Sequence, residues 1–108
     1  MYALLQNTTG IYNSAFGRGA LQSNSSGGAN SAFGRFALNY NTVGGNNTAV
    51  GFNCMLANVS GNNNAAFGYS ALYNNTTNNN SAFGSNALFA NTTGYGNSAF
   101  GKDSLKGN

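Results

Sequence analysis

The chain has 108 residues, of which 5% are charged; it contains 16 Gly, one Cys and no Pro, Trp or His, and its net charge is +3. With Asp103 as the only acidic side chain and no His, it lacks the groups needed for general acid–base catalysis, for activation of a nucleophile and for a zinc site. Four cations form no basic stripe for nucleic acid, and no apolar run reaches the length of a membrane span. We therefore expect no enzyme, no catalytic residues, no cofactor, no metal, no nucleic-acid partner and no membrane insertion.

One phrase recurs along the chain. It reads NSAFG at residues 13–17, 30–34, 80–84 and 97–101, NTAVG at 47–51 and NAAFG at 64–68. The closing glycines lie 17, 17, 17, 16 and 17 residues apart, and we expect them to form turns: Gly17, Gly34, Gly51, Gly68, Gly84 and Gly101. Where the shorter step falls, we expect Asn78 to take the turn position that Gly10 has in the first repeat. A fixed period is the signature of a repeat protein, so residues 1–108 are interpreted as a single repeat domain.

Each repeat is too short, and too rich in Gly and Asn, to hold a pair of helices. Short strands between Gly and Asn corners fit the pattern better, because both residue types tolerate the left-handed backbone of a corner. The predicted fold is therefore all-β: a β-solenoid (β-roll or β-helix) of six to seven coils of 17 residues. Successive coils would stack about 4.8 Å apart through backbone hydrogen bonds.

Two hydrophobic columns recur in register, and both are predicted to form the core. The first follows the Ala of the phrase: Phe16, Phe33, Val50, Phe67, Phe83 and Phe100. The second lies in the A-L part of the repeat: Leu4, Leu21, Leu38, Met55, Leu72, Leu88 and Leu105. In the third coil Val50 is smaller than Phe, whereas Cys54 and Met55 replace Ala and Leu. We interpret these changes as conservation of volume inside one packed core.

The Ala of the phrase faces away from the Phe, because side chains alternate along a strand. Ser14 should thus share the face of Phe16, with Ala15 on the other face. If the Ala column points outward, it offers a smooth surface through which copies could pair laterally or form a trimer. The alternative is that these alanines pack against a second apolar layer of the same chain.

Polar residues also form columns. Stacked like charges would repel, whereas Asn, Ser and Thr can form hydrogen-bonded ladders, which accounts for the scarcity of charge. Eight Asn begin the triplet N-x-[ST] and are candidate glycosylation sites, although so many triplets are expected by chance in this composition: Asn7, Asn24, Asn46, Asn58, Asn74, Asn75, Asn79 and Asn91. A further column is rich in hydroxyl groups: Thr8, Ser25, Thr42, Val59, Thr76 and Thr92.

The full unit, N-[ST]-A-[FV]-G-x-x-A-L-x-x-N-T-T-G, resembles the Asn/Gly-rich repeats of bacterial and phage tail-fibre-type surface proteins. More distantly it resembles the heads of trimeric autotransporter adhesins. The resemblance covers nearly the whole chain and implies a repetitive β-roll or solenoid, extracellular or at the cell surface, that serves adhesion or fibre formation. The adhesin heads use shorter repeats with a different strand motif, so their trimerisation and their receptors are not carried over.

These observations predict a structural subunit of an extracellular self-assembling fibre or surface adhesin. Its main partners would be copies of itself, because the outer coils of a solenoid expose unpaired backbone groups and no atypical capping segment is evident between Ala3 and Asn108. Two alternatives stay open at this stage. The hydroxyl-rich column could bind ice, or the chain could be a receptor-binding segment of a phage tail fibre.

Overall fold

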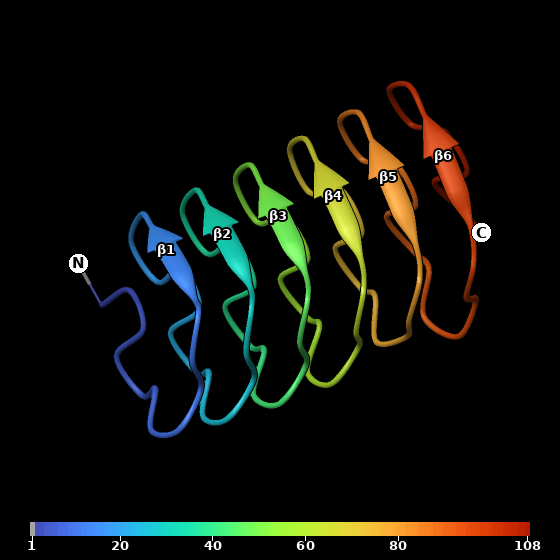
Figure 1. The fold of residues 1–108 in the computed structure, drawn as a ribbon. Coiled ribbons are helices and arrows are strands. Elements are labelled where there is room, and N and C mark those ends of the chain that lie inside the picture. The colour runs from blue at the N-terminus through green and yellow to red at the C-terminus, as the bar shows by residue number, and fades with distance from the viewer. Residues whose placement is uncertain (1) are drawn as a thin grey trace.

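A computed structural model describes residues 2–108 and contains a β-solenoid, as the period predicts (Figure 1). The strands of this part are β1 Ser14–Phe16, β2 Ser31–Phe33, β3 Thr48–Val50, β4 Ala65–Phe67, β5 Ser81–Phe83 and β6 Ser98–Phe100. They form one sheet in the order β1-β2-β3-β4-β5-β6, and every pair of neighbours is parallel. The chain winds once between successive strands, so its two ends lie at opposite ends of the stack (Figure 1).

Neighbouring strands pair so that equivalent residues of successive repeats lie opposite each other. Ser14 is opposite Ser31, Ala15 is opposite Ala32, and Phe16 is opposite Phe33. The register persists across the shortened repeat, where Phe67 is opposite Phe83. Each residue therefore lies on the equivalent residue of the next coil, so the columns of the sequence are columns in space.

Tight turns follow each strand and carry the chain back. After β1, the N–H of Ala20 donates to the carbonyl of Gly17 at 3.1 Å, and the N–H of Gln22 donates to the carbonyl of Gly19 at 3.3 Å. The third residue of each turn has positive φ, 73° at Gly19 and 49° at Leu21, as type II turns require. The predicted turn glycines also have positive φ, from 116° to 139°. At Gly34 a side chain is excluded for a second reason, because a Cβ would lie 2.5 Å from the carbonyl oxygen of Gly51.

The interior is lined by small and medium apolar side chains. The Leu column lies inside, with Leu21, Leu38, Met55, Leu72 and Leu88 fully buried. At the two ends of the stack, Leu4 is half-buried and Leu105 is 48% exposed. The second wall of the interior is the Ala column of the strands, which is buried from Ala32 to Ala99.

The prediction that the Phe column lies inside is wrong. Phe16, Phe33, Phe67 and Phe100 are 65%, 40%, 38% and 70% exposed, and Val50 and Phe83 are half-buried. The alternation along the strand was correct, but Ala and not Phe faces inward. The reason is the width of the coil: the molecule measures 16 Å along its shortest axis, which leaves room between two backbone walls for Leu against Ala but not for Leu against Phe.

Two further expectations change with this result. The Ala column does not form an outward face, so it cannot serve lateral pairing or a trimer; it packs against the second apolar layer, Ala20 and Leu21 and their equivalents. Val50 also cannot compensate for Met55, because one lies outside the coil and the other inside.

In the shortened repeat, Thr77 and not Asn78 takes the place that Gly10 and Gly61 have in their own repeats, so the expectation for Asn78 is wrong. The side-chain amide of Asn75 donates to the carbonyl of Thr77 at 2.9 Å, as that of Asn58 donates to Gly61 at 3.0 Å.

Candidate functional surface

No enclosed site is present in residues 2–108. This part of the chain has no pocket, and it has no group of three or more Cys, Asp or Glu that could hold a metal ion. None of its segments is a helix long and apolar enough to cross a membrane.

A ladder of buried Asn side chains runs along the interior. The amide of Asn41 donates to the Oδ1 of Asn24 at 2.9 Å, and the amide of Asn58 donates to the Oδ1 of Asn41 at the same distance. Each of these amides also donates to a carbonyl in its own coil, that of Gly44 for Asn41 and that of Gly61 for Asn58. The members of this column are Asn7, Asn24, Asn41, Asn58, Asn75 and Asn91.

A second ladder begins each strand. The amide of Asn30 donates to the carbonyl of Gly44 at 2.8 Å, and its Oδ1 accepts the backbone N–H of Asn47 at 3.0 Å. The same glycine carbonyl therefore accepts two Asn amides, one from each ladder. Within residues 2–108 no buried side-chain nitrogen or oxygen lacks a partner. The two ladders thus satisfy the polar groups of the interior and hold one coil in register with the next.

These ladders decide where a glycan could be attached. Asn24, Asn58 and Asn75 are fully buried and Asn91 is 1% exposed, and the amide nitrogen that would carry the sugar is a ladder donor in each. Asn7 is half-buried and donates in the same way. These five candidates are therefore incompatible with glycosylation of the folded chain. Asn46 and Asn79 lie exposed at corners, and Asn74 is half-buried.

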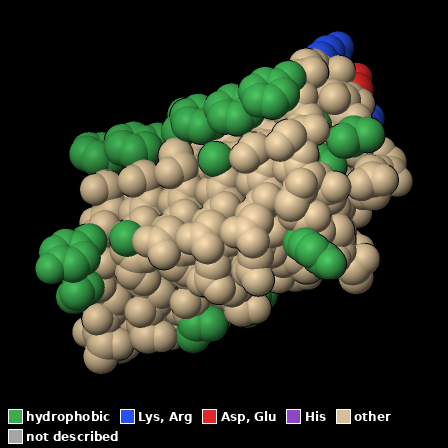
Figure 2. All heavy atoms as spheres, turned by 45° about the vertical axis from the view of Figure 1, so that its right-hand side comes forward, with side chains coloured by type: hydrophobic (Ala, Val, Ile, Leu, Met, Phe, Trp, Pro, Cys, Tyr) green, Lys and Arg blue, Asp and Glu red, His purple; other side chains and the backbone are tan. Residues whose placement is uncertain are grey.

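The Phe column forms an exposed ridge on the outer face of the sheet. The rings of Phe16 and Phe33 stack with centroids 5.0 Å apart, and those of Phe67, Phe83 and Phe100 stack at 4.9 Å for each neighbouring pair. Val50 interrupts the stack between Phe33 and Phe67. Figure 2 shows a row of hydrophobic side chains along one edge of the molecule, running toward the charged groups of the C-terminal coil. We call this row the Phe ridge: Phe16, Phe33, Val50, Phe67, Phe83 and Phe100.

A second outer column lies beside the ridge and mixes cations with aromatic rings. The guanidinium carbon of Arg35 lies 4.8 Å from the ring centroid of Phe36 and 5.6 Å from that of Phe52. Phe52 in turn stacks on Tyr69 at 5.5 Å. The guanidinium of Arg35 is therefore stabilised by the negative faces of these rings, which favours a cation at this place in a stacked column.

The hydroxyl-rich column uses its hydroxyl hydrogens between coils. The Oγ1 of Thr8 donates to the carbonyl of Ser25 at 2.9 Å, and the Oγ1 of Thr76 donates to the carbonyl of Thr92 at 2.8 Å. Val59 interrupts the column. Because these donors already bond to the backbone, the column offers an ice lattice fewer groups than its composition suggests.

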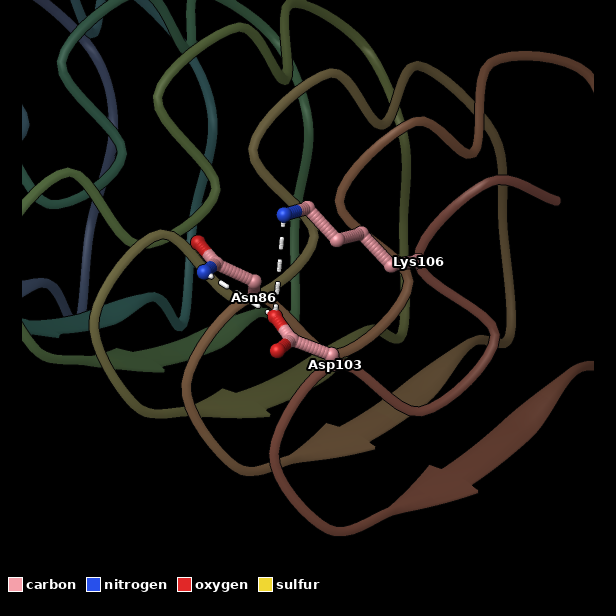
Figure 3. A network of polar contacts seen from close by, with 3 residues as sticks. All are labelled: Asn86, Asp103 and Lys106. Carbon is pink, nitrogen blue, oxygen red and sulfur yellow. Dashed lines mark hydrogen bonds and ion pairs between the residues drawn. The ribbon is translucent and has the colours of Figure 1, made fainter.

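Asp103 and Lys106 of the C-terminal coil form a small network with Asn86 of the preceding coil (Figure 3). The Oδ1 of Asp103 lies 3.7 Å from the Nζ of Lys106 and accepts a hydrogen bond of 3.2 Å from the amide of Asn86. Both charged side chains are about half exposed, so the pair contributes little stability.

The thiol of Cys54 is enclosed by the core. Its Sγ lies 3.3 Å from the carbonyl oxygen of Ala66 and donates a hydrogen bond to it. Burial raises the pKa of this thiol from 9.0 to about 12. At neutral pH the group is a small apolar filler and not a nucleophile.

No family model, curated protein or solved structure matches this chain. Among the described residues, the exposed Phe ridge and the two open edges of the sheet are the surfaces that another molecule could contact. Sequence reasoning placed the ridge inside, and it expected ladders of Asn, Ser and Thr without placing the two Asn columns in the interior. The available signal was that both Asn columns contain no other residue type in any repeat, whereas exposed columns vary.

Proposed function

We propose that this chain is a structural subunit of an extracellular self-assembling fibre or surface adhesin, in which the coils of successive copies stack end to end. The observation that carries the proposal is the pair of open sheet edges. Among the described strands β1 and β6 each pair on one side only, and both have the sequence Ser-Ala-Phe. A copy whose β1 lay on β6 would repeat the register that joins β5 to β6. The extracellular placement is supported by the resemblance of the repeats alone.

The polar ladders support the same contact. The N–H of Asn97 donates to the Oδ1 of Asn80 at 2.9 Å. In an end-to-end stack the N–H of Asn13 of the next copy would donate to the Oδ1 of Asn97 in the same way. A shifted register would leave these polar groups without partners, so the ladders favour one register over the others.

The chain has one more A-L-x-x-N segment than it has strands, so one of these segments must be displaced where two copies meet. The A-L-x-x-N segment occurs seven times and the strand phrase six times. For β1 to lie directly on β6, residues 3–7 of one copy must therefore take the place of residues 104–108 of the other. That exchange replaces equivalent hydrogen bonds, such as the one from the N–H of Leu88 to the carbonyl of Ser104 at 2.9 Å. Residues 105–108 are exposed, so their displacement uncovers little apolar surface.

The test removes the backbone N–H of Ser98, which points out of the open edge of β6 toward the next copy. In β5 the N–H of Ser81 donates to the carbonyl of Asn97 at 2.8 Å, and Ser98 has the same position at the open edge of β6. Ser98→Pro removes that donor and places a ring where the next copy would approach, which an edge strand tolerates. We expect the unmodified chain to form filaments with a meridional spacing of about 4.8 Å in fibre diffraction. Ser98→Pro should give no filaments.

Ser98→Ala is the matched control, because Ala65 occupies this position in β4 and pairs on both sides. It should assemble like the unmodified chain. Circular dichroism and urea unfolding would verify that Ser98→Pro leaves the fold intact. The proposal fails if the unmodified chain sediments as a small particle at high concentration, or if Ser98→Pro forms the same filaments.

A further inference from the structure

The Phe ridge is a second contact surface, independent of the sheet edges. With the exposed fractions given above, its four exposed Phe side chains present about 400 Å² of apolar surface, taking roughly 200 Å² for a whole Phe side chain. A continuous apolar patch of a few hundred Å² on a small protein is typical of an interaction site. Two such ridges in contact would bury about 800 Å² from these rings, and flanking Ser and Gly residues bring the total toward the range of specific interfaces.

The orientation of the rings restricts what can bind there. The rings of Phe83 and Phe100 are parallel within 1°, and those of Phe16 and Phe33 within 9°. Their faces are turned toward one another along the stack, so solvent meets the ring edges. A ligand that needs open ring faces, such as a sugar or a nucleobase, finds none between the stacked neighbours and meets a free face only where a stack ends. A second row of hydrophobic edges with the same spacing of about 4.9 Å matches it coil by coil.

We propose that a second copy of this chain packs on the ridge with its solenoid axis antiparallel. The position of Val50 favours that direction. In a parallel pair Val50 would face Val50 and leave a hole in the contact, since every other member of the ridge is Phe. In an antiparallel pair β3 faces β4 of the partner, so that Val50 meets Phe67 and no two small side chains are opposite.

The first experiment measures the mass of the particle by sedimentation, in the Ser98→Pro background so that end-to-end stacking does not contribute. We expect dimers in this background. Phe67→Asp would place an unpaired charge at the centre of the contact and should raise the dissociation constant at least tenfold. Tyr95→Asp is the matched control, because Tyr95 is 77% exposed and lies outside the ridge; it should leave the dimer unchanged. A monomeric background protein, or equal effects of the two substitutions, would overturn the proposal.

The second experiment tests whether the two solenoid axes are antiparallel, and it does not introduce a charge into the contact. Phe33→Cys and Phe83→Cys are made separately in a Cys54→Ala, Ser98→Pro background, then mixed and mildly oxidised. An antiparallel ridge contact brings position 33 against position 83 of the other copy, so cross-linked heterodimers should exceed homodimers. A parallel contact would instead link position 33 to itself, which refutes the antiparallel arrangement. End-to-end stacking separates these positions by three coils, about 14 Å, and produces neither product.

Discussion

Ordinary side chains adopt left-handed backbone at the corners of every coil. Leu21, Leu38 and Leu72 have φ of 49°, 51° and 51°, a region that costs an L-residue about 1–2 kcal/mol. Full burial of a Leu side chain contributes about 1.5–3 kcal/mol, which offsets the cost. The corner is therefore stable because the residue that is strained is also the residue that fills the core.

Cys54 provides a prediction about pH. Its pKa is raised by burial to about 12 in the folded chain, against 9.0 as its ordinary value, so the unfolded chain loses the proton first as pH rises. The stability associated with the neutral thiol is fully present below pH 9 and is lost between pH 9 and 12, by up to about 1.4 kcal/mol per pH unit. Between pH 8 and 10 we expect the unfolding free energy to fall by about 1.4 kcal/mol more than in Cys54→Ala.

Urea unfolding of both proteins at the two pH values measures this difference. Ala is the appropriate replacement because it occupies the same position in most other coils, and the tyrosines ionise in both proteins alike. Identical pH dependence in the two proteins would show that the thiol is not held neutral by the fold.

At the scale of the coil, the Asn ladders replace what a larger hydrophobic core would provide. Asn58 connects Asn41, Gly61 and Asn75 through its side-chain amide. Asn58→Ala would remove both amide donors and the acceptor, and leave buried polar groups unsatisfied at roughly 1–3 kcal/mol each. We expect a loss of about 3 kcal/mol or more in unfolding free energy, measured by urea denaturation.

Asn62→Ala serves as the control for that substitution. The Oδ1 of Asn62 accepts the N–H of Gly45 at 2.7 Å, but the residue is exposed, so water can take over the lost contact. Its cost should stay within about 1 kcal/mol. If the two variants lost the same unfolding free energy, a buried Asn of the ladder would contribute no more to stability than an exposed Asn with one hydrogen bond.

At the scale of the whole molecule, the two proposed contact surfaces lie at right angles to each other. The sheet edges lie at the ends of the stack, whereas the Phe ridge runs along its side (Figures 1 and 2). Blocking one contact should therefore leave the other intact. We expect Phe67→Asp alone to give single filaments and Ser98→Pro alone to give dimers.

The double variant Phe67→Asp, Ser98→Pro should stay monomeric at every concentration tested by light scattering and electron microscopy. Its fold should be unchanged, since both positions lie on the surface. If the double variant still assembles, a third surface holds copies together and the two proposed contacts do not account for assembly.

The sequence by itself determined the architecture. The period of the glycines from Gly17 to Gly101 fixes where each coil closes, and repetition of the same residues requires that each coil stack in register on its neighbour. The Leu column was also predicted to lie inside, because it is apolar in every coil, and it is buried everywhere except at the two ends of the stack. These features depend on local turn chemistry and on repetition, and both can be recognised in the amino-acid sequence.

Tertiary structure decided which side of each strand is the inside. Alternation separates Ala32 from Phe33 but is symmetric, so it does not say which of them faces inward. The hydrophobic effect favours burying Phe, but the narrow coil accommodates only small residues opposite Leu38, and the exposed Phe residues are left to stack on one another. For the same reason Asn41 and Asn47 are buried: only there can their amides reach both the next coil and the glycine carbonyls. These outcomes depend on the width of the closed coil, a distance that no stretch of sequence contains.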